Sequence, residues 1–308
     1  MKKIFWSILL LIPCGIIFAC DACSSSSMSG LNGQLLQTNQ TFVGFGFNTV
    51  RQTNRASSIY NNHAANFIAA HSFKEKWQIM AVLPFQLQKS NTPESFNMET
   101  GLGDARIMAT YQVFKTPETK LKPASHNLFT RAGLKLPTGK YLNENPEFMP
   151  LGTGSVDFLL SSQYIFERKK MGFNGNLDAR INTANKSNML FGHQFSLTSF
   201  YFYKKELKSS MIMPFVGAVS EYITKNRSNG FVRNFSGGKA LYGLLGFQTL
   251  INSKYSLIVT GEIPIAQRYQ SIEGLLYADY RVQATFSFIF NQKQKGVENA
   301  PLNIQVNN

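Results

Sequence analysis

Residues 279–290 read DYRVQATFSFIF, and this is the least ambiguous alternation of polar and apolar residues in the chain. Successive side chains of a strand point to opposite faces, so the stretch predicts a strand with one apolar wall and one mostly polar wall. In water, three phenylalanines on one face need a covering layer, whereas in a membrane they need none. The apolar parity holds Tyr280, Val282, Ala284, Phe286, Phe288 and Phe290, and the polar parity holds Arg281, Gln283, Thr285 and Ser287.

The start of the chain is a separate element. Lys2 and Lys3 precede an apolar stretch that is shorter than the roughly 20 residues of a spanning helix, so residues 1–19 predict a secretory signal peptide, with cleavage up to residue 22. We expect residues 20–40, which are rich in Ser, Gly, Asn and Gln, to form a flexible lead-in or a small plug. Nothing later in the sequence approaches a transmembrane helix, so membrane insertion would have to use strands.

All three cysteines, Cys14, Cys20 and Cys23, lie in or just after the signal, which leaves the rest of the chain without a disulfide framework or thiol catalysis. Residues 17–19 before Cys20 resemble a lipoprotein cleavage box, so Cys20 is the lipidation candidate. Cys20 and Cys23 have the spacing of a metal or redox pair, but they supply only two of the four ligands of a structural zinc site. We therefore expect no metal and no cofactor.

The composition suits an exported all-β protein. The 308 residues are 44% hydrophobic with a mean hydropathy of -0.14, which excludes a helical membrane protein. The formal charge of +14 could indicate a nucleic-acid partner. Because an exported chain rarely meets nucleic acid, we expect none, and anionic lipid headgroups are the expected partners of the basic surface.

Segments of alternating polarity recur from residue 41 onward, and each has about the length that a tilted strand needs to cross a bilayer. They predict an all-β fold, a transmembrane antiparallel up-and-down β-barrel over residues 41–290. The barrel would be closed by pairing of 279–290 with 41–50 and followed by a polar periplasmic tail over 291–308. The twelve segments are approximately 41–50, 65–74, 77–88, 101–114, 126–137, 154–167, 171–182, 191–204, 209–222, 239–251, 254–266 and 279–290.

The lengths of the connections favour a membrane barrel over a soluble sandwich. Short turns at one end and long loops at the other are typical of outer-membrane barrels, whereas a Greek-key sandwich mixes its connections. An even number of strands then places both termini in the periplasm of a Gram-negative cell. The connections expected to be long are 51–64, 89–100, 138–153, 183–190, 223–238 and 267–278, and only 115–125 breaks the alternation with short ones.

Charged residues share the polar wall of these segments, and we expect them to act as selectivity elements in the lumen and at its mouth. A two-residue turn at Arg168-Lys169 would place Asp157 opposite Arg180, a pair worth roughly 0.2–1 kcal/mol. The candidates are Asp104, Arg106, Arg131, Lys135, Asp157, Asp178, Arg180, Glu262 and Arg281.

Other inward positions are apolar, and two interpretations stay open. An apolar inner wall would suit the passage of hydrophobic molecules, but small barrels also fill their interiors with side chains. These positions are Phe129, Phe200, Phe202, Tyr242, Leu244 and Ile258.

Three glycine-rich blocks fall at the expected outer rim of neighbouring strands: residues 101–105 (GLGDA), 136–141 (LPTGKY) and 152–157 (GTGSVD). Turn chemistry is one interpretation of these blocks, and a constriction lined by Asp104 and Asp157 at the mouth is the functional alternative. In this order the blocks resemble the outer-membrane barrel family named after the MetA pathway of phenol degradation. The Cys-Asp-Ala-Cys after the signal is similar to that of Bacteroidetes-type members. The resemblance implies an outer-membrane transporter or channel, with hydrophobic or aromatic compounds as candidate substrates.

We therefore expect a channel that passes small molecules across the outer membrane, with the solute, membrane lipid and the barrel assembly machinery as partners. The alternative is a structural or adhesive barrel with a plugged lumen that binds surface lipid or polysaccharide. A membrane-embedded hydrolase would need a serine activated by a histidine, but the sequence has no G-x-S-x-G elbow, although His193 lies near Ser196. We expect no enzyme activity. The other histidines considered for that role are His63, His71 and His126.

Overall fold

The computed structural model describes residues 40–54, 58–73, 76–93, 95–116, 119, 123–141, 150–271 and 274–291. The expected signal peptide, the lead-in before residue 40, Cys20, Cys23 and the tail beyond residue 291 lie outside these residues. In the described part of the chain, no helix is long and apolar enough to cross a membrane. The same residues contain no group of three or more His, Cys, Asp or Glu side chains that could hold a metal ion.

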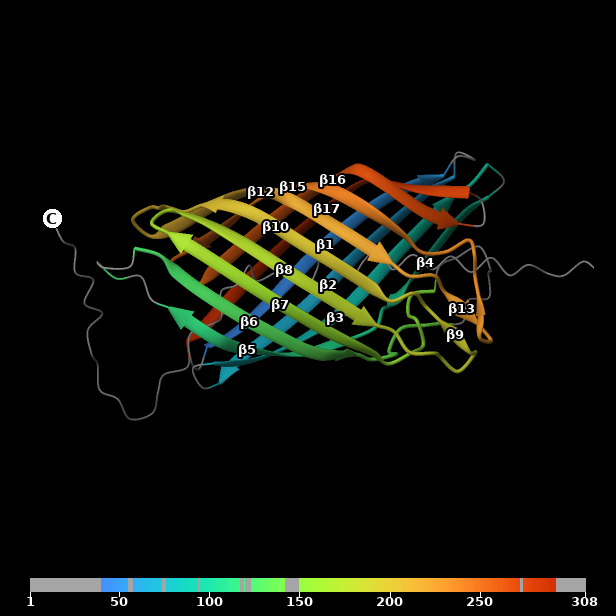
Figure 1. Ribbon diagram of the computed structural model, residues 1–308, viewed down its shortest axis with the longest axis horizontal. Helices are drawn as coiled ribbons and strands as arrows, with labels where there is room; N and C mark the ends of the chain where they lie inside the picture. Colours follow the sequence, from blue (N-terminus) through green and yellow to red (C-terminus); the bar gives the residue numbers. More distant parts are fainter. Residues whose placement is uncertain are drawn as a thin grey trace, which may run out of the picture.

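The described residues form an antiparallel β-barrel of tilted strands (Figure 1). Its long strands are β1 (Gln40–Asn54), β2 (Ile59–Phe73), β3 (Trp77–Asn91), β4 (Phe96–Leu102), β5 (Arg106–Thr116), β6 (Ser125–Lys135), β7 (Asp157–Arg168), β8 (Met171–Ile181), β10 (Gln194–Tyr203), β12 (Ser210–Ile223), β15 (Gly238–Ile251), β16 (Tyr255–Ser271) and β17 (Gly274–Asn291). Two-residue strands are β9 (Met189–Leu190), β11 (Lys205–Glu206), β13 (Arg227–Ser228) and β14 (Phe231–Val232).

Twelve strands form the wall of the barrel, as the sequence predicts. One sheet holds 14 of the described strands; β11 adds only two residues to it and β4 continues β5 across a break, which leaves 14 − 1 − 1 = 12. The sheet closes because β10 pairs with both β8 and β12. The predicted closing pair is confirmed, since β17 lies antiparallel to β1 with Phe290 opposite Thr41 and Phe286 opposite Phe45.

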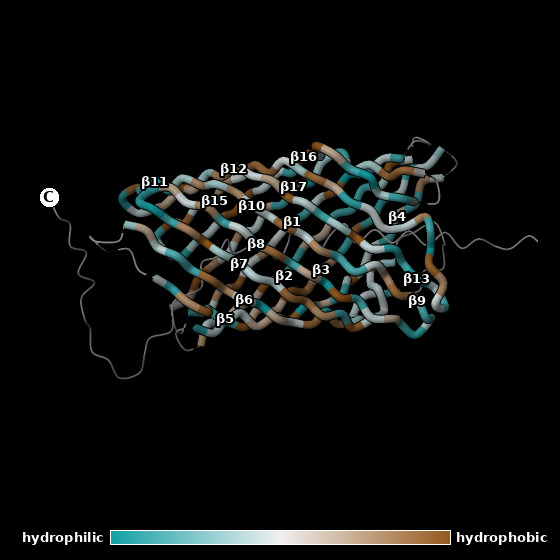
Figure 2. Tube along the Cα trace, viewed as in Figure 1, coloured by the Kyte–Doolittle hydropathy of each residue, from teal (hydrophilic) through white to brown (hydrophobic). Residues whose placement is uncertain are grey.

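The alternation of β17 separates the two surfaces of the barrel. Phe286 and Phe290 are 49% and 45% exposed on the outside, while Thr285 and Ser287 are buried on the inside. Hydrophobic and hydrophilic residues alternate in the same way along the other strands (Figure 2). The barrel therefore has an apolar outer band of the kind that faces lipid.

The two ends of the barrel differ. At the end where β1 begins and β17 finishes, which we call the terminal end, β7 and β8 are joined by two residues and β15 and β16 by three. At the other end, the loop end, the longer connections are 136–156, 182–193 and 224–237.

Three connections predicted to be long loops are instead mostly strand. β1 and β2 are joined across 55–58, β3 and β4 across 92–95, and β16 and β17 across 272–273, so the loop predictions for 51–64, 89–100 and 267–278 are wrong. Polar residues still alternate there, and the backbone ladder continues past the apolar band, for example from Asn62 opposite Val50 to Tyr60 opposite Gln52.

The predicted pairing of Asp157 with Arg180 is also wrong. The turn between β7 and β8 is Lys169-Lys170, with Lys169 at φ 56, so Arg168 lies opposite Met171. This register places Leu159 opposite Arg180, two residues away from the prediction. An even shift preserves the face, so Asp157 and Arg180 both point inward and both are buried.

The ladder between β16 and β17 is interrupted near the loop end. Pairing stops at Glu262 opposite Arg281 and resumes at Tyr269 opposite Leu276. In the gap, the carboxamide of Gln267 donates to Ala278 O (2.9 Å) and accepts from Ala278 N (2.8 Å). A side chain thus provides the hydrogen bonds that the backbone ladder omits.

Candidate functional site

Ten charged residues form a belt on the inner wall, nearer the loop end, and we call them the charged belt. All nine predicted selectivity candidates belong to it, and eight of these are buried, while Asp178 is partly buried. With five acidic and five basic members, the belt is formally neutral. The members are Asp104, Arg106, Arg131, Lys135, Asp157, Asp178, Arg180, Glu221, Glu262 and Arg281. Their role in selectivity stays a prediction.

Lys135 lies between two carboxylates, and we call Asp104, Lys135 and Asp157 the loop clamp. Lys135 Nζ lies 3.0 Å from Asp104 Oδ2 and 2.5 Å from Asp157 Oδ2, and none of the three side chains is more than 6% exposed. Thr153 donates to Asp104 Oδ2 from its backbone N (2.8 Å) and its hydroxyl (3.0 Å), and Ser155 donates to Asp157 Oδ1 (2.8 Å). The clamp therefore joins the starts of β5 and β7 to the end of β6.

The three glycine-rich blocks meet around this clamp. Gly139 N donates to Asp104 Oδ1 at 3.0 Å. A Cβ on Gly139 would lie 2.9 Å from atoms of Gly103 and Gly152, and a Cβ on Gly152 would lie 2.4 Å from Asp104 Oδ1. The glycines are needed because the backbones approach too closely for any side chain. Turn chemistry alone does not explain the blocks, because their backbones also pack closely around the charged side chains of the loop clamp.

Further hydrogen bonds extend from the clamp across the loop end, and we call residues 136–141, 150–156, 182–193 and 224–237 the loop cap. Asn185 Nδ2 donates to Thr153 O (2.9 Å), Gly192 N donates to Asn226 Oδ1 (2.8 Å), and Asn226 N donates to Ser236 Oγ (2.9 Å). The segments of the cap lie together at one end of the barrel (Figure 1). These hydrogen bonds join three of the described segments of the loop cap to one another.

Arg281 forms the second ionic cluster of the belt. Its guanidinium bonds both carboxylate oxygens of Glu221 (2.6 and 2.9 Å) and lies 3.4 Å from Glu262 Oε2. It also donates to Tyr242 Oη (2.8 Å), while Tyr269 Oη donates to Glu221 Oε2 (2.8 Å). The sequence analysis predicted Arg281 and Glu262 but missed Glu221. The alternation of β12 could have identified Glu221, because this residue lies on the same face as the other inward residues of the strand.

Apolar side chains cover much of the inner wall on both sides of the charged belt. Met213 and Phe215 of β12 lie on the terminal side of Glu221, whereas Tyr269 and Leu276 lie on the loop side of Glu262 and Arg281. Phe200 and Phe215 have ring centroids 4.8 Å apart. The predicted inward apolar residues are all confirmed as buried: Phe129, Phe200, Phe202, Tyr242, Leu244 and Ile258. On the opposite wall a second cluster holds Phe42, Ile68, Ala70 and Val82.

The remaining candidates lie apart from these clusters. Arg131 bonds Gln163, and Asp178 accepts a hydrogen bond from Asn176, all on neighbouring inward positions. The histidines considered for a hydrolase are spread over the wall: His63 and His71 on β2, His126 on β6 and His193 just before β10. His193, the histidine near Ser196, accepts a hydrogen bond from Asn182 N (3.1 Å).

The family model described as "Putative MetA-pathway of phenol degradation" matches residues 89–248, which is more than half of the 308 residues. The chain belongs to this family. The match confirms the resemblance predicted from the glycine-rich blocks, and the matched part of this MetA-pathway family member contains the whole loop clamp. Comparison with curated proteins finds no match.

Solved structures show which fold this MetA-pathway family member shares. The COG4313 outer membrane channel from Pseudomonas putida F1 is similar with a TM-score of 0.68 at 13% identity, over 83% of this chain and 97% of that one. The β domain of the Bordetella autotransporter BrkA is similar with a TM-score of 0.50 at 10% identity, over 82% of this chain and 100% of that one. The chain therefore has the fold of outer-membrane barrels.

Proposed function

We propose that this protein is an outer-membrane channel that passes small hydrophobic or aromatic molecules. The observation that carries the proposal is the inner wall, where aromatic and aliphatic side chains lie on both sides of a belt of paired charges. An apolar solute gains from contact with such a wall, whereas an ion would lose its hydration there. The structural likeness to a channel and the family supply the context.

The charged belt supports a solute without net charge. Its acids and bases are formally balanced, and two of its basic residues, Lys135 and Arg281, are already bound by carboxylates. Such a belt offers hydrogen-bonding groups at the mouth without a strong field of either sign. The nine predicted members would then set selectivity by excluding bulky solutes and by holding the cap, more than by attracting ions.

The proposed orientation places both termini in the periplasm and the loop cap outside the cell. The three longest connections, 136–156, 182–193 and 224–237, all lie at the loop end and support this orientation, because outer-membrane barrels have short periplasmic turns and longer external loops. Insertion would be performed by the barrel assembly machinery, and lipid would contact the outer apolar band. Passage requires the cap to move, with the clamp as the contact that holds it shut.

Solute flux into proteoliposomes tests the proposal. The purified protein is reconstituted into vesicles whose outer leaflet contains lipopolysaccharide, and entry of a small aromatic alcohol is compared with entry of a sugar of similar mass. We expect faster entry of the alcohol than into protein-free vesicles, and a smaller effect on the sugar. Folded barrels that speed neither solute would contradict the proposal.

A plugged structural or adhesive barrel is the second candidate. The hydrogen-bonded loop cap favours it, as does the exposure of Phe231 and Phe235 within that cap (78% and 66%). A barrel of this type would bind surface lipid or polysaccharide and give no flux. The proteoliposome measurement therefore separates the two candidates.

A further inference from the structure

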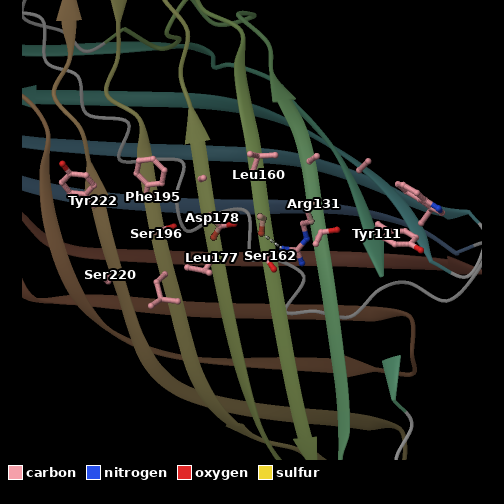
Figure 3. A pocket seen from close by; sticks show the side chains of 17 residues that line it. Tyr111, Arg131, Leu160, Ser162, Leu177, Asp178, Phe195, Ser196, Ser220 and Tyr222 are labelled. Atoms are coloured by element: carbon pink, nitrogen blue, oxygen red, sulfur yellow. Dashed lines mark hydrogen bonds between the residues drawn. The ribbon is translucent and has the colours of Figure 1, made fainter. Parts of the chain in front are cut away.

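A furrow of about 790 Å³ crosses the outer wall of the barrel from β3 to β12 (Figure 3). Alanines occupy three of four successive paired outward positions on its floor: Ala109 lies opposite Ala132, and Leu160 lies opposite both Ala132 and Ala179. On a barrel wall whose other outward positions carry many Phe, Leu and Ile side chains, this run of alanines leaves a hollow.

Aromatic residues close the furrow at both ends (Figure 3). Trp77 and Tyr111, with ring centroids 4.7 Å apart, stand at one end, and Phe195 and Tyr222 stand at the other. Trp77 is the first residue of β3, at the terminal end, whereas Tyr222 lies near the last residue of β12, at the loop end. The furrow thus runs obliquely over the apolar band, as an extended hydrocarbon chain would.

Two exposed basic residues continue the line of the furrow past Tyr222. Lys239 lies opposite Tyr222, and Arg268 lies opposite Lys239, so the three are neighbours on the outer face of β12, β15 and β16. The next outward residue of β15 toward the terminal end is Leu241, which belongs to the apolar band. Lys239 and Arg268 therefore stand where the hydrocarbon gives way to headgroups, and basic residues at that level attract lipid phosphates.

Ser220 adds a polar group at the same end. It lines the furrow two residues before Tyr222 on β12 and is exposed. The hydrocarbon region holds no water for such a hydroxyl, so a partner must come from protein or lipid. An ester or amide carbonyl at the base of a lipid headgroup would supply an acceptor at this depth.

We propose that the furrow binds the lipid A part of lipopolysaccharide, with one acyl chain along the alanine floor and a phosphate at Lys239 and Arg268. The choice of lipid A rests on the orientation in the proposed function, because it is the phosphorylated lipid of the outer leaflet that surrounds the loop end. An outward groove for one lipid would fix the position of the barrel in that leaflet. Most residues that line the furrow point outward, and the proposed positions of the acyl chain and of the phosphate lie on that outer face.

Titration of the purified protein with lipid A tests the site, with the bound fraction read by native mass spectrometry. Lys239→Gln combined with Arg268→Gln should weaken binding about tenfold or more, since each basic residue near a lipid surface contributes attraction. The matched control, Lys169→Gln combined with Lys170→Gln, removes the same charge from an exposed turn at the terminal end and should leave the affinity within about twofold.

A second pair of variants tests the furrow itself. Ala132→Trp fills the floor and should weaken lipid A binding, whereas Ala65→Trp adds the same side chain at an exposed outward position of β2, outside the furrow, and should not. Heat-modifiable gel mobility confirms that each variant is a folded barrel. If Ala132→Trp does not fold, the exposed Lys239 and Arg268 variant still decides.

Specific loss in the two furrow variants, with weaker binding of phosphatidylglycerol by the wild type, would support the site. Unchanged lipid A affinity in the Lys239 and Arg268 variant, or phosphatidylglycerol bound as tightly as lipid A, would overturn it. Because no step measures solute flux, failure of this proposal and failure of the proposed function are distinguishable.

Discussion

Lys135 is the residue on which the proposed closure of the loop end depends most. It places one positive charge between Asp104 and Asp157, and removing one partner of a buried ion pair typically costs about 3–5 kcal/mol. Lys135→Met should therefore release the loop cap, and uptake of a small aromatic alcohol into proteoliposomes should rise several-fold. Lys170→Met, at an exposed turn, is the control. A Lys135→Met barrel with wild-type uptake would show that the clamp does not hold the cap.

Arg281 and Glu221 should be energetically coupled, since they share two hydrogen bonds in a buried setting. Arg281→Met leaves Glu221 beside Glu262 without a cation, and we expect it to destabilise the barrel by about 3–5 kcal/mol. Adding Glu221→Gln should recover part of that loss. Urea unfolding of the two single variants and the double variant measures the coupling. Strictly additive effects would argue against the pair.

For a single residue, the sequence predicts whether the side chain points inward or outward, but not which residue it contacts. Parity placed nine charged residues inward, and each of them faces inward. Partners depend on register, which is why Asp157 was predicted opposite Arg180 and is bound by Lys135 instead. Glu221 was missed because Met213, Phe215 and Val219 give its face of β12 an apolar character.

Among the elements, the strands were predictable and their ends were not. The three basic residues at 168–170 contain neither Gly nor Asn to mark the turn, and Lys169 adopts the positive φ there. The sequence predicts loops for the hairpin extensions beyond the apolar band because polar residues interrupt the apolar pattern of their faces. The strands are already paired within the apolar band, and this alignment lets the backbone ladder continue beyond it.

The interrupted ladder between β16 and β17 makes a local prediction. Gln267→Ala removes both hydrogen bonds to Ala278, and each is worth about 1 kcal/mol. We expect faster hydrogen exchange around Ala278 and little change elsewhere, because the rest of the ladder stays paired. Gln270→Ala, an exposed position three residues further along β16, is the control. Equal rates of hydrogen exchange around Ala278 in the two variants would mean that Gln267 does not stabilise the interrupted part of the ladder.

For the whole molecule, the sequence predicts the barrel but not the contacts within the loop cap. Strand number and closure follow from period-two alternation, which is a local signal. The loop cap does not, since its bonds join residues far apart in the chain, such as Thr153 with Asp104 and Gly192 with Asn226. The glycine-rich blocks predict close backbone approaches at the rim, but only the fold shows that the three blocks meet at Asp104.

The central claim is that the apolar inner wall forms a path for small apolar molecules. Uptake of a small aromatic alcohol into proteoliposomes that contain the wild-type protein tests it most directly, with heat-modifiable mobility as proof that the barrel is folded. We predict uptake that is faster than in protein-free vesicles and that a second aromatic alcohol slows in a concentration-dependent way, because both alcohols occupy the apolar section of the lumen. Folded, inserted barrels that give no faster uptake and no competition between the alcohols would contradict the account.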